Sequence, residues 1–245
     1  MDIKPPFGYK DIVPLNRDQK VRLLRPGEMP EFARSLNAIP ISYTEFALVA
    51  REYPIVFTAV AGSQVFNPVA VLGMTANENL YNNGGAWAGN VYIPAYARRF
   101  PFCMTRVTLD KVEQQNRLIC IEKTFLDESG EAMFDAKGQP LEKWKEIERL
   151  LTEYEVDLER SREMCGILAD YGLLEPFTMQ AKFNKGGDPL HLTGMHRVAE
   201  AKIEHLNASQ LKNLVKKGIL SRVYAHLLSL ENFARLLERK AAKAA

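Results

Sequence analysis

The residues best suited to chemistry lie between positions 87 and 102, where two consecutive arginines are surrounded by aromatic side chains. A guanidinium beside aromatic rings, next to a loop rich in Asn and Gly, is a common way to hold a carboxylate, a sugar or a peptide end. This pattern predicts a ligand-binding site made of Trp87, Tyr92, Tyr96, Arg98 and Arg99. Two alternatives stay open: Glu45 or Glu78 pairs with the arginines, or the aromatic side chains form core beneath the loop.

A second candidate anion contact is His196, which precedes Arg197 beside a predicted hairpin. The alternative is a surface histidine at a strand end. His191 and His196 are five residues apart, so on one regular strand they face opposite sides and cannot share a metal ion. Cys103 and Cys120 have no second ligand at metal-binding spacing. We therefore predict neither a metal nor a cofactor.

The sequence carries no established catalytic motif. It has no Walker A loop, G-x-S-x-G elbow, H-E-x-x-H pair or G-x-G-x-x-G loop. Cys103, just after the arginine pair, is the best-placed nucleophile, although a buried core cysteine is the simpler interpretation. An enzyme, or an obligate subunit of one, would draw acid–base groups from Glu45, His196 and His226.

Composition indicates an ordinary globular protein. The chain has 245 residues, 47% hydrophobic and 25% charged, and a net charge of +2, which gives no general attraction to nucleic acid. The first residues lack the basic and apolar regions of a secretory signal, and no apolar run approaches the roughly 20 residues of a membrane-spanning helix. The three separated cysteines suit a reducing compartment. We expect a soluble, cytoplasmic protein.

The elements that must position these residues begin with a proline-rich arm. Residues 1–31 contain five prolines, which favours an extended segment with at most short strands. Thr44 is expected to cap a helix over 44–51. Alternation and turn residues predict strands over 55–61, 66–74, 104–109 and 118–124. Pro68 points to a sheet edge or a bulge at the start of the second of these.

The clearest element is a long amphipathic helix. Apolar residues recur at steps of three and four from Trp144 to Leu168, which predicts a helix over 141–171 that ends at Gly172. Beyond it we predict a hairpin and two further helices, and a fraying tail from Lys240: strands 177–183 and 189–198 around a turn at 184–188, then helices 207–218 and 220–237, with a restart near Ser229.

This order of elements predicts an α+β fold with a mostly antiparallel sheet, one long amphipathic helix and a helical C-terminal region. We expect a single domain over residues 1–245. Its parts are an arm at 1–31, a strand-rich part at 32–140, and a part with the long helix, the hairpin and the C-terminal helices at 141–239.

An ordered set of short motifs resembles the SapC-like family of bacterial proteins, from about Val13 to Leu237. The matching segments are Glu45-Phe46, Tyr53-Pro-Ile-Val-Phe57, Leu72-Gly73, Asn77-Glu-Asn-Leu-Tyr81, Trp87, Tyr92-Ile-Pro94, Arg98-Arg-Phe-Pro-Phe102, Gly194-Met-His-Arg-Val198 and Tyr224-Ala-His-Leu-Leu-Ser-Leu230. Where the family has a histidine shortly after the segment corresponding to Leu15-Asn-Arg17, this chain has Gln19-Lys20.

The resemblance implies an association with surface-layer proteins and a genomic neighbourhood of outer-membrane uptake receptors and flavin-dependent halogenase-like proteins. It supplies no catalytic motif. It also separates the chain from the peptide-transporter permease of the same name, since the sequence has no spanning segments.

We therefore expect an accessory or binding protein that recognises a small polar or anionic ligand or a protein partner, in a surface-layer or nutrient-uptake system. One alternative is an enzyme or enzyme subunit that uses His/Glu acid–base chemistry. The other is a dimeric scaffold that pairs through the helix at Leu141–Tyr171. The discriminating observations are convergence of the His and Glu side chains in one pocket and the oligomeric state.

Overall fold

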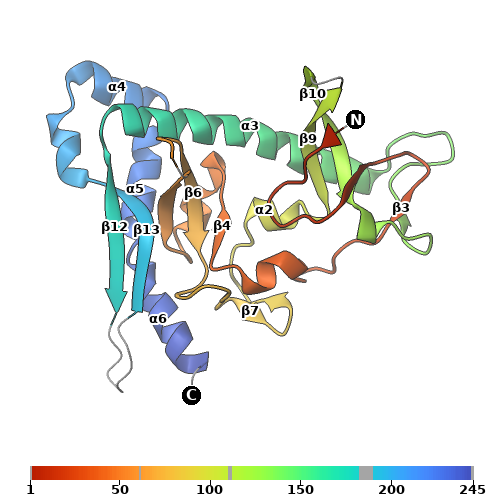
Figure 1. Cartoon of the computed structure of the whole chain (residues 1–245), viewed down its shortest axis with the longest axis horizontal. Coiled ribbons are helices and arrows are strands. Elements are labelled where there is room, and N and C mark those ends of the chain that lie inside the picture. The colour runs from red at the N-terminus through yellow and green to blue at the C-terminus, as the bar shows by residue number, and fades with distance from the viewer. Residues whose placement is uncertain (1, 61, 110–111, 182–189, 244–245) are drawn as a thin grey trace.

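The long helix joins two sheets, each with its own buried core. The computed structural model describes residues 2–60, 62–109, 112–181 and 190–243. Helix α3 (Glu142–Asp170) has 29 residues and, at 1.5 Å per residue, is about 43 Å long. In Figure 1 it runs across the top of the molecule over both sheets. The α+β class with antiparallel sheets and a long helix is confirmed.

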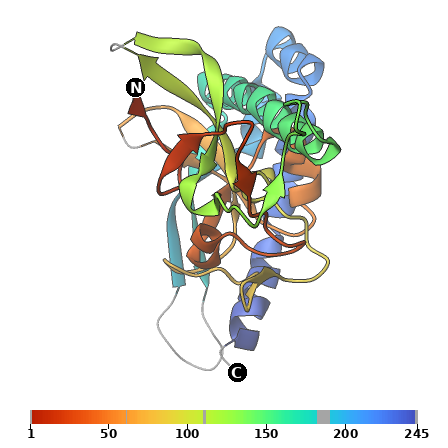
Figure 2. The ribbon, with the colours of Figure 1, turned by 90° about the vertical axis from the view of Figure 1, so that its right-hand side faces the viewer.

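The four-stranded lobe contains the N-terminal arm. Its antiparallel order is β1-β9-β10-β2, formed by β1 (Asp2–Ile3), β9 (Phe102–Leu109), β10 (Val112–Glu122) and β2 (Ile12–Pro14). A further arm strand, β3 (Lys20–Val21), pairs with β11 (Glu131–Ala132). Figure 2 shows the arm in red beside β9 and β10. The expectation of an extended arm with short strands is thus confirmed.

The five-stranded lobe has the order β12-β13-β5-β6-β4. Its strands are β12 (Leu174–Ala181), β13 (Leu190–Val198), β5 (Ile55–Ala59), β6 (Phe66–Val71) and β4 (Ala38–Pro40). The predicted hairpin strands pair as expected, and the turn predicted at 184–188 lies outside the described residues.

Pro68 does not mark a sheet edge, because β6 lies between β5 and β4. Its carbonyl accepts a hydrogen bond from the N–H of Ile41, just beyond the end of β4. Pro68 lies opposite Ile41, one pair beyond the Pro40–Val69 pair, and it has no N–H to return a second hydrogen bond to Ile41, so the β4–β6 ladder ends at this proline.

Three helices complete the five-stranded lobe: α4 (Ala208–Lys216), α5 (Ile219–Ser229) and α6 (Asn232–Lys243). Asn207 caps α4, and Gly218, at φ +69°, provides the left-handed residue before α5. The fraying expected from Lys240 is wrong for the described residues, since α6 continues to Lys243 and the Lys240 ammonium lies 2.6 Å from the Glu78 carboxylate; positions 244–245 lie outside them.

The remaining elements are short. The helix predicted over 44–51 is a 3-10 turn that leads into one turn of α-helix, and its cap is Ser42 rather than Thr44, whose hydroxyl instead bonds Asp157 on α3. The others are η1 (Glu31–Ser35), η2 (Tyr43–Glu45), α1 (Phe46–Val49), β7 (Asn82–Asn83), β8 (Ala86–Trp87), α2 (Ala95–Arg98), η3 (Lys123–Phe125) and η4 (Glu200–His205).

The apolar stripe of α3 is buried within the chain. Trp144 and Leu151 pack in the core of the four-stranded lobe, whereas Met164 and Leu168 pack in the core of the five-stranded lobe. A dimer through α3 would therefore use its other, charged face. Among the described residues, no helix is long and apolar enough to cross a lipid bilayer.

Candidate functional site

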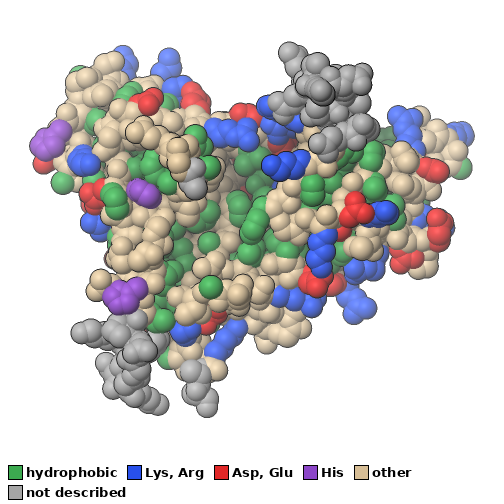
Figure 3. Space-filling view, viewed as in Figure 1, with side chains coloured by type: hydrophobic (Ala, Val, Ile, Leu, Met, Phe, Trp, Pro, Cys, Tyr) green, Lys and Arg blue, Asp and Glu red, His purple; other side chains and the backbone are tan. Residues whose placement is uncertain are grey.

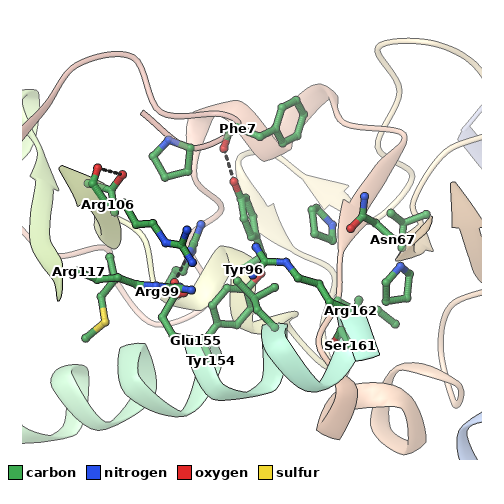
Figure 4. Close-up of a pocket in the computed structure, with 18 of the residues that line it drawn as sticks. Phe7, Asn67, Tyr96, Arg99, Arg106, Arg117, Tyr154, Glu155, Ser161 and Arg162 are labelled. Atoms are coloured by element: carbon green, nitrogen blue, oxygen red, sulfur yellow. Dashed lines mark hydrogen bonds and ion pairs between the residues drawn. The ribbon is translucent and has the colours of Figure 1, made fainter. Parts of the chain in front are cut away.

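The two lobes enclose a cleft of about 850 Å³ over the middle of α3. Tyr154 and Glu155 form its floor, the β9–β10 hairpin lies on one side, and β5 and β6 lie on the other. The N-terminal arm passes over it at residues 4–7, where the Tyr96 hydroxyl donates a 2.5 Å hydrogen bond to the carbonyl of Phe7. Figure 4 shows this arrangement. The cleft exists only because distant segments meet.

Arg99 is the most unusual side chain in the cleft. It follows the last residue of α2, and only 4% of it is exposed. Its guanidinium carbon lies 4.2 Å from the centre of the Tyr96 ring and 4.6 Å from that of Tyr154. Aromatic faces attract a cation, but they accept no ordinary hydrogen bond. Nε of Arg99 accordingly has no hydrogen-bond partner among the described residues.

The cleft carries an excess of positive charge. Arg106 and Arg117 are direct cross-strand partners on β9 and β10, an arrangement that is unfavourable unless negative charge lies nearby. The cleft lining holds five cations and one carboxylate: Lys4, Arg99, Arg106, Arg117 and Arg162 against Glu155. Arg106 has a further interaction of its own, so it is left out of the balance; Lys4, Arg99, Arg117 and Arg162 against Glu155 and Glu159, which bonds both Arg117 and Arg162, leave +2. Figure 4 shows the four arginines directed over α3.

Carboxylates neutralise this cluster only in part. Glu155 forms an ion pair with Arg117, and its Oε1 lies 3.7 Å from Nη1 of Arg99, beyond hydrogen-bond distance. A hydrogen bond from Arg162 holds the pKa of Glu159 below its ordinary value. Both carboxylates are thus already engaged with arginines.

The three tyrosines around Arg99, of which Tyr96 and Tyr154 line the cleft, carry no negative charge at pH 7. Burial raises the pKa of Tyr9, Tyr96 and Tyr154 above the ordinary value, so each phenol stays neutral at pH 7. The Tyr9 hydroxyl donates a 2.6 Å hydrogen bond to the carbonyl of Phe102. These groups position Arg99 but contribute no negative charge, so Glu155, at 3.7 Å, is the carboxylate that faces it among the described residues.

The structure divides the predicted aromatic and arginine cluster between two sides. Tyr96 and Arg99 line the cleft, whereas Trp87 and Arg98 line a separate groove of about 370 Å³, which Arg99 also borders. Successive residues of a helix point about 100° apart, so neighbouring arginines at the end of α2 reach different surfaces. Arg98 donates 3.0 Å and 2.9 Å hydrogen bonds to the carbonyl of Ile93 and the hydroxyl of Tyr92.

Trp87 is 6% exposed, and its Nε1 has no hydrogen-bond partner among the described residues. The Tyr92 hydroxyl donates a 3.0 Å hydrogen bond to Glu45. Arg98 therefore reaches Glu45 only through Tyr92, and Glu78 pairs with Lys240 instead. Neither Glu45 nor Glu78 bonds Arg99. The carboxylate that forms an ion pair with Arg99 is that of Glu155, at 3.7 Å.

His196 is not part of the cleft. It is the cross-strand partner of Phe57, and neighbouring Thr58, which lines the cleft, points to the other face of the sheet. Its ring lies 4.9 Å from the Phe66 ring, and its Nδ1 is buried without a hydrogen-bond partner among the described residues. The predicted anion contact at His196 and the arginine cleft are separate places.

Two of the candidate acid–base groups, Glu45 and His226, form hydrogen bonds with backbone groups and so stabilise the fold. Glu45 accepts hydrogen bonds from the backbone N–H groups of Ser42 (2.7 Å) and Ala95 (2.6 Å). Nε2 of His226 accepts from the N–H of Val198 at 3.1 Å, and its Nδ1 donates to the carbonyl of Ile55 at 2.8 Å. Burial lowers the pKa of His226 to about 4, so the ring is neutral at pH 7.

Cys103 is fully buried, and burial raises the pKa of its thiol to about 12. A thiol at that pKa carries almost no thiolate at pH 7, so it is a poor nucleophile. No hydrogen bond among the described residues joins Glu45, His196 and His226 into one group, and none of the three lines the cleft.

Sequence reasoning missed most of the cleft. Two signals were present: Arg106 lies on the strand predicted over 104–109 while Arg117 directly precedes the strand predicted over 118–124, and charged residues recur beside the Tyr154 stripe of the long helix. Neither signal locates the cleft without the strand register and the packing of α3. The residues missed are Lys4, Arg106, Arg117, Tyr154, Glu155 and Arg162.

Fold and site together define an α+β protein with a cationic cleft between two lobes. The SapC family model matches residues 16–236, which is most of the chain. The chain belongs to the SapC family, as its motifs led us to expect. No curated protein and no solved structure matches it.

Proposed function

We infer that the protein binds a small anionic ligand in the cleft between its lobes. The observation that carries this proposal is Arg99, a guanidinium that is almost entirely buried, has an unpaired Nε and lies among other arginines. A buried donor without an acceptor, and a buried charge without full compensation, each cost free energy. A carboxylate or phosphate in the cleft would supply both the acceptor and the charge.

Binding is favoured over catalysis by the composition of the cleft. Its described lining contains no histidine and no cysteine, and its tyrosines are held neutral by burial. Glu155 is already paired with arginine. The cleft is therefore built to hold an anion, and a proton-transfer role would need a group that the substrate itself brings.

Membership of the SapC family supports an accessory role in surface-layer or nutrient-uptake systems. In that role the protein would hold an anionic small molecule for a partner rather than transform it. Arg98, Trp87 and His196 would contribute to contacts outside the cleft.

The test is isothermal titration calorimetry with inorganic phosphate, pyrophosphate, citrate and acetate at low ionic strength. Arg99→Lys keeps the charge but removes the planar donor fork, so we expect at least a tenfold loss of affinity for the anion that binds best. Arg98→Lys is the matched control, and its affinity should stay within twofold of the wild type.

Failure of all four anions to bind at millimolar concentration would overturn the proposal. Equal losses of anion affinity in Arg98→Lys and Arg99→Lys would show that the anion does not bind specifically in the cleft. Because exposed charges are screened by salt, the affinity of the wild type should also fall as ionic strength rises.

A further inference from the structure

A second hollow, of about 300 Å³, adjoins the arginine cleft on the same face of the five-stranded sheet. Thr58 and Val69 line both hollows, so the two meet at these side chains. The space beside the arginines therefore continues along the sheet.

Strand register explains why the two hollows share a face. Thr58 on β5 is the cross-strand partner of both Asn67 on β6 and Met195 on β13. Side chains two residues apart on a strand point the same way, which adds Val69 and Val71 to this face. The opposite face, with Phe57, packs against His226 of α5.

The two hollows differ sharply in chemistry. The described lining of the second one contains no Lys, Arg, Asp or Glu, although it includes His191. Its apolar side chains are those of Ala38, Val56, Val69, Val71, Met74, Ala76, Leu192 and Met195. Figure 3 shows this face, with Lys and Arg side chains near the arginine cleft and hydrophobic side chains below them. A single bound molecule that occupied both would need a charged end and an apolar end.

We propose that the ligand is a small amphiphilic anion. Its carboxylate or phosphate headgroup lies among Arg99, Arg117 and Arg162, and its apolar chain passes Thr58 and Val69 into the second hollow. This inference rests on the proposed function, because it requires the arginine cleft to hold an anion. It adds the class of ligand: a headgroup joined to a chain, rather than a free inorganic anion.

The expected gain from the chain is measurable. Each methylene group that is fully buried contributes about a fourfold increase in affinity. The headgroup must remain, because the arginines would otherwise stay uncompensated when the chain displaces water from the cleft. An alcohol with the same chain should therefore bind far more weakly than the phosphate.

The experiment titrates the full chain with inorganic phosphate, octyl phosphate and octanol, with octyl phosphate kept below the concentration at which it forms micelles. We expect octyl phosphate to bind at least tenfold more tightly than inorganic phosphate, and octanol to give no measurable binding. Octanoate against acetate repeats the comparison for a carboxylate and shows which headgroup the arginines take; in either case the chain must add at least tenfold.

Thr58→Trp blocks the junction of the two hollows. It should reduce the affinity for octyl phosphate to that for inorganic phosphate, while binding of inorganic phosphate shows that the variant is folded. Thr58→Ser is the matched control and should bind both ligands as the wild type does. Asn67→Trp, at the exposed cross-strand neighbour of Thr58, is a second blocking variant if Thr58→Trp does not fold.

The outcomes separate this inference from the proposed function. If inorganic phosphate binds and octyl phosphate binds no more tightly, the inference is overturned and the anion site stands. If octyl phosphate binds more tightly but the folded blocking variants leave that gain intact, the chain lies elsewhere and the inference is overturned. If no anion binds, both the proposed function and this inference are overturned. Equal binding of octanol and octyl phosphate would overturn the joint role of the arginines and the sheet.

Discussion

Two buried side chains on opposite sides of the five-stranded sheet, His226 and Arg99, differ in how their nitrogen atoms are paired. On the face beneath α5, His226 has a partner at each ring nitrogen, and the Ser229 hydroxyl both accepts from the N–H of Ile55 and donates to the carbonyl of His226. On the face toward the cleft, Arg99 is equally buried, yet its Nε is unpaired and its nearest carboxylate lies beyond hydrogen-bond distance.

This difference distinguishes His226, which stabilises the fold, from Arg99, which under our proposal binds an anion. A buried group whose partners are all within the chain has no reason to bind anything else, and its loss leaves those partners unsatisfied. A buried group without partners costs stability until a ligand arrives. The comparison predicts that changes beneath α5 affect stability alone, whereas changes in the cleft couple stability to anions.

The largest loss of stability is expected for His226→Leu. This change leaves the carbonyl of Ile55 and the N–H of Val198 without partners, which should lower the free energy of unfolding by about 3 kcal/mol. Phosphate affinity of the folded protein should not change. Urea unfolding and calorimetry measure the two quantities, and His205→Leu is the control because the His205 side chain is 77% exposed. Weakened phosphate binding in His226→Leu would contradict the expectation that changes beneath α5 affect stability alone.

His226 should also make stability depend on pH. The unfolded histidine binds a proton near pH 6.5, whereas the folded one does so only near its pKa of about 4. The unfolded state therefore binds more protons in this window, and stability rises with pH until it is fully present above pH 6.5. Lowering the pH from 6.5 to 4 should remove about 3 kcal/mol, and His226→Leu should lose this dependence.

Glu155→Gln tests whether stability in the cleft depends on anions. The change removes the carboxylate that pairs with Arg117 and lies near Arg99, so in phosphate-free buffer we expect a loss of about 2 kcal/mol. Added phosphate should restore most of that stability, and the variant should bind phosphate more tightly than the wild type. Glu163→Gln on the same helix is the matched control, since Glu163 pairs with Lys217 at the surface. A loss that phosphate does not restore would contradict the assignment of the cleft.

Arg99→Met should have a small effect on stability and a large effect on binding. Methionine removes an unpaired buried donor and an incompletely compensated charge while it keeps the packing between Tyr96 and Tyr154, so the free energy of unfolding should change by less than about 1 kcal/mol. Phosphate binding should fall at least tenfold. Normal phosphate binding by a folded Arg99→Met protein would show that another group holds the anion.

The smallest effect is expected for Arg98→Ala. Arg98 is exposed and lies in the groove rather than in the cleft, so stability should change by less than about 0.5 kcal/mol. Phosphate affinity should remain within twofold of the wild-type value. A larger loss of affinity would mean that the groove and the cleft act together, through Arg99, which borders both.

The sequence by itself determined the local elements. The helix predicted over 141–171 is observed as Glu142–Asp170, and the break predicted near Ser229 separates α5 from α6. Both follow from short-range periodicity and end signals, which act over a few residues. The sequence also identified Tyr96 and Arg99 as candidate ligand contacts and, through its ordered motifs, the SapC family.

Only the tertiary structure decided which of these residues share a site. Arg98 and Arg99 are neighbours in sequence but line different surfaces, whereas Arg106 and Arg117 come from separate strands and meet Arg162 of α3 in one cleft. Strand register and the packing of α3 across both lobes set these positions. They depend on contacts between residues dozens of positions apart, which no local pattern of residue types encodes.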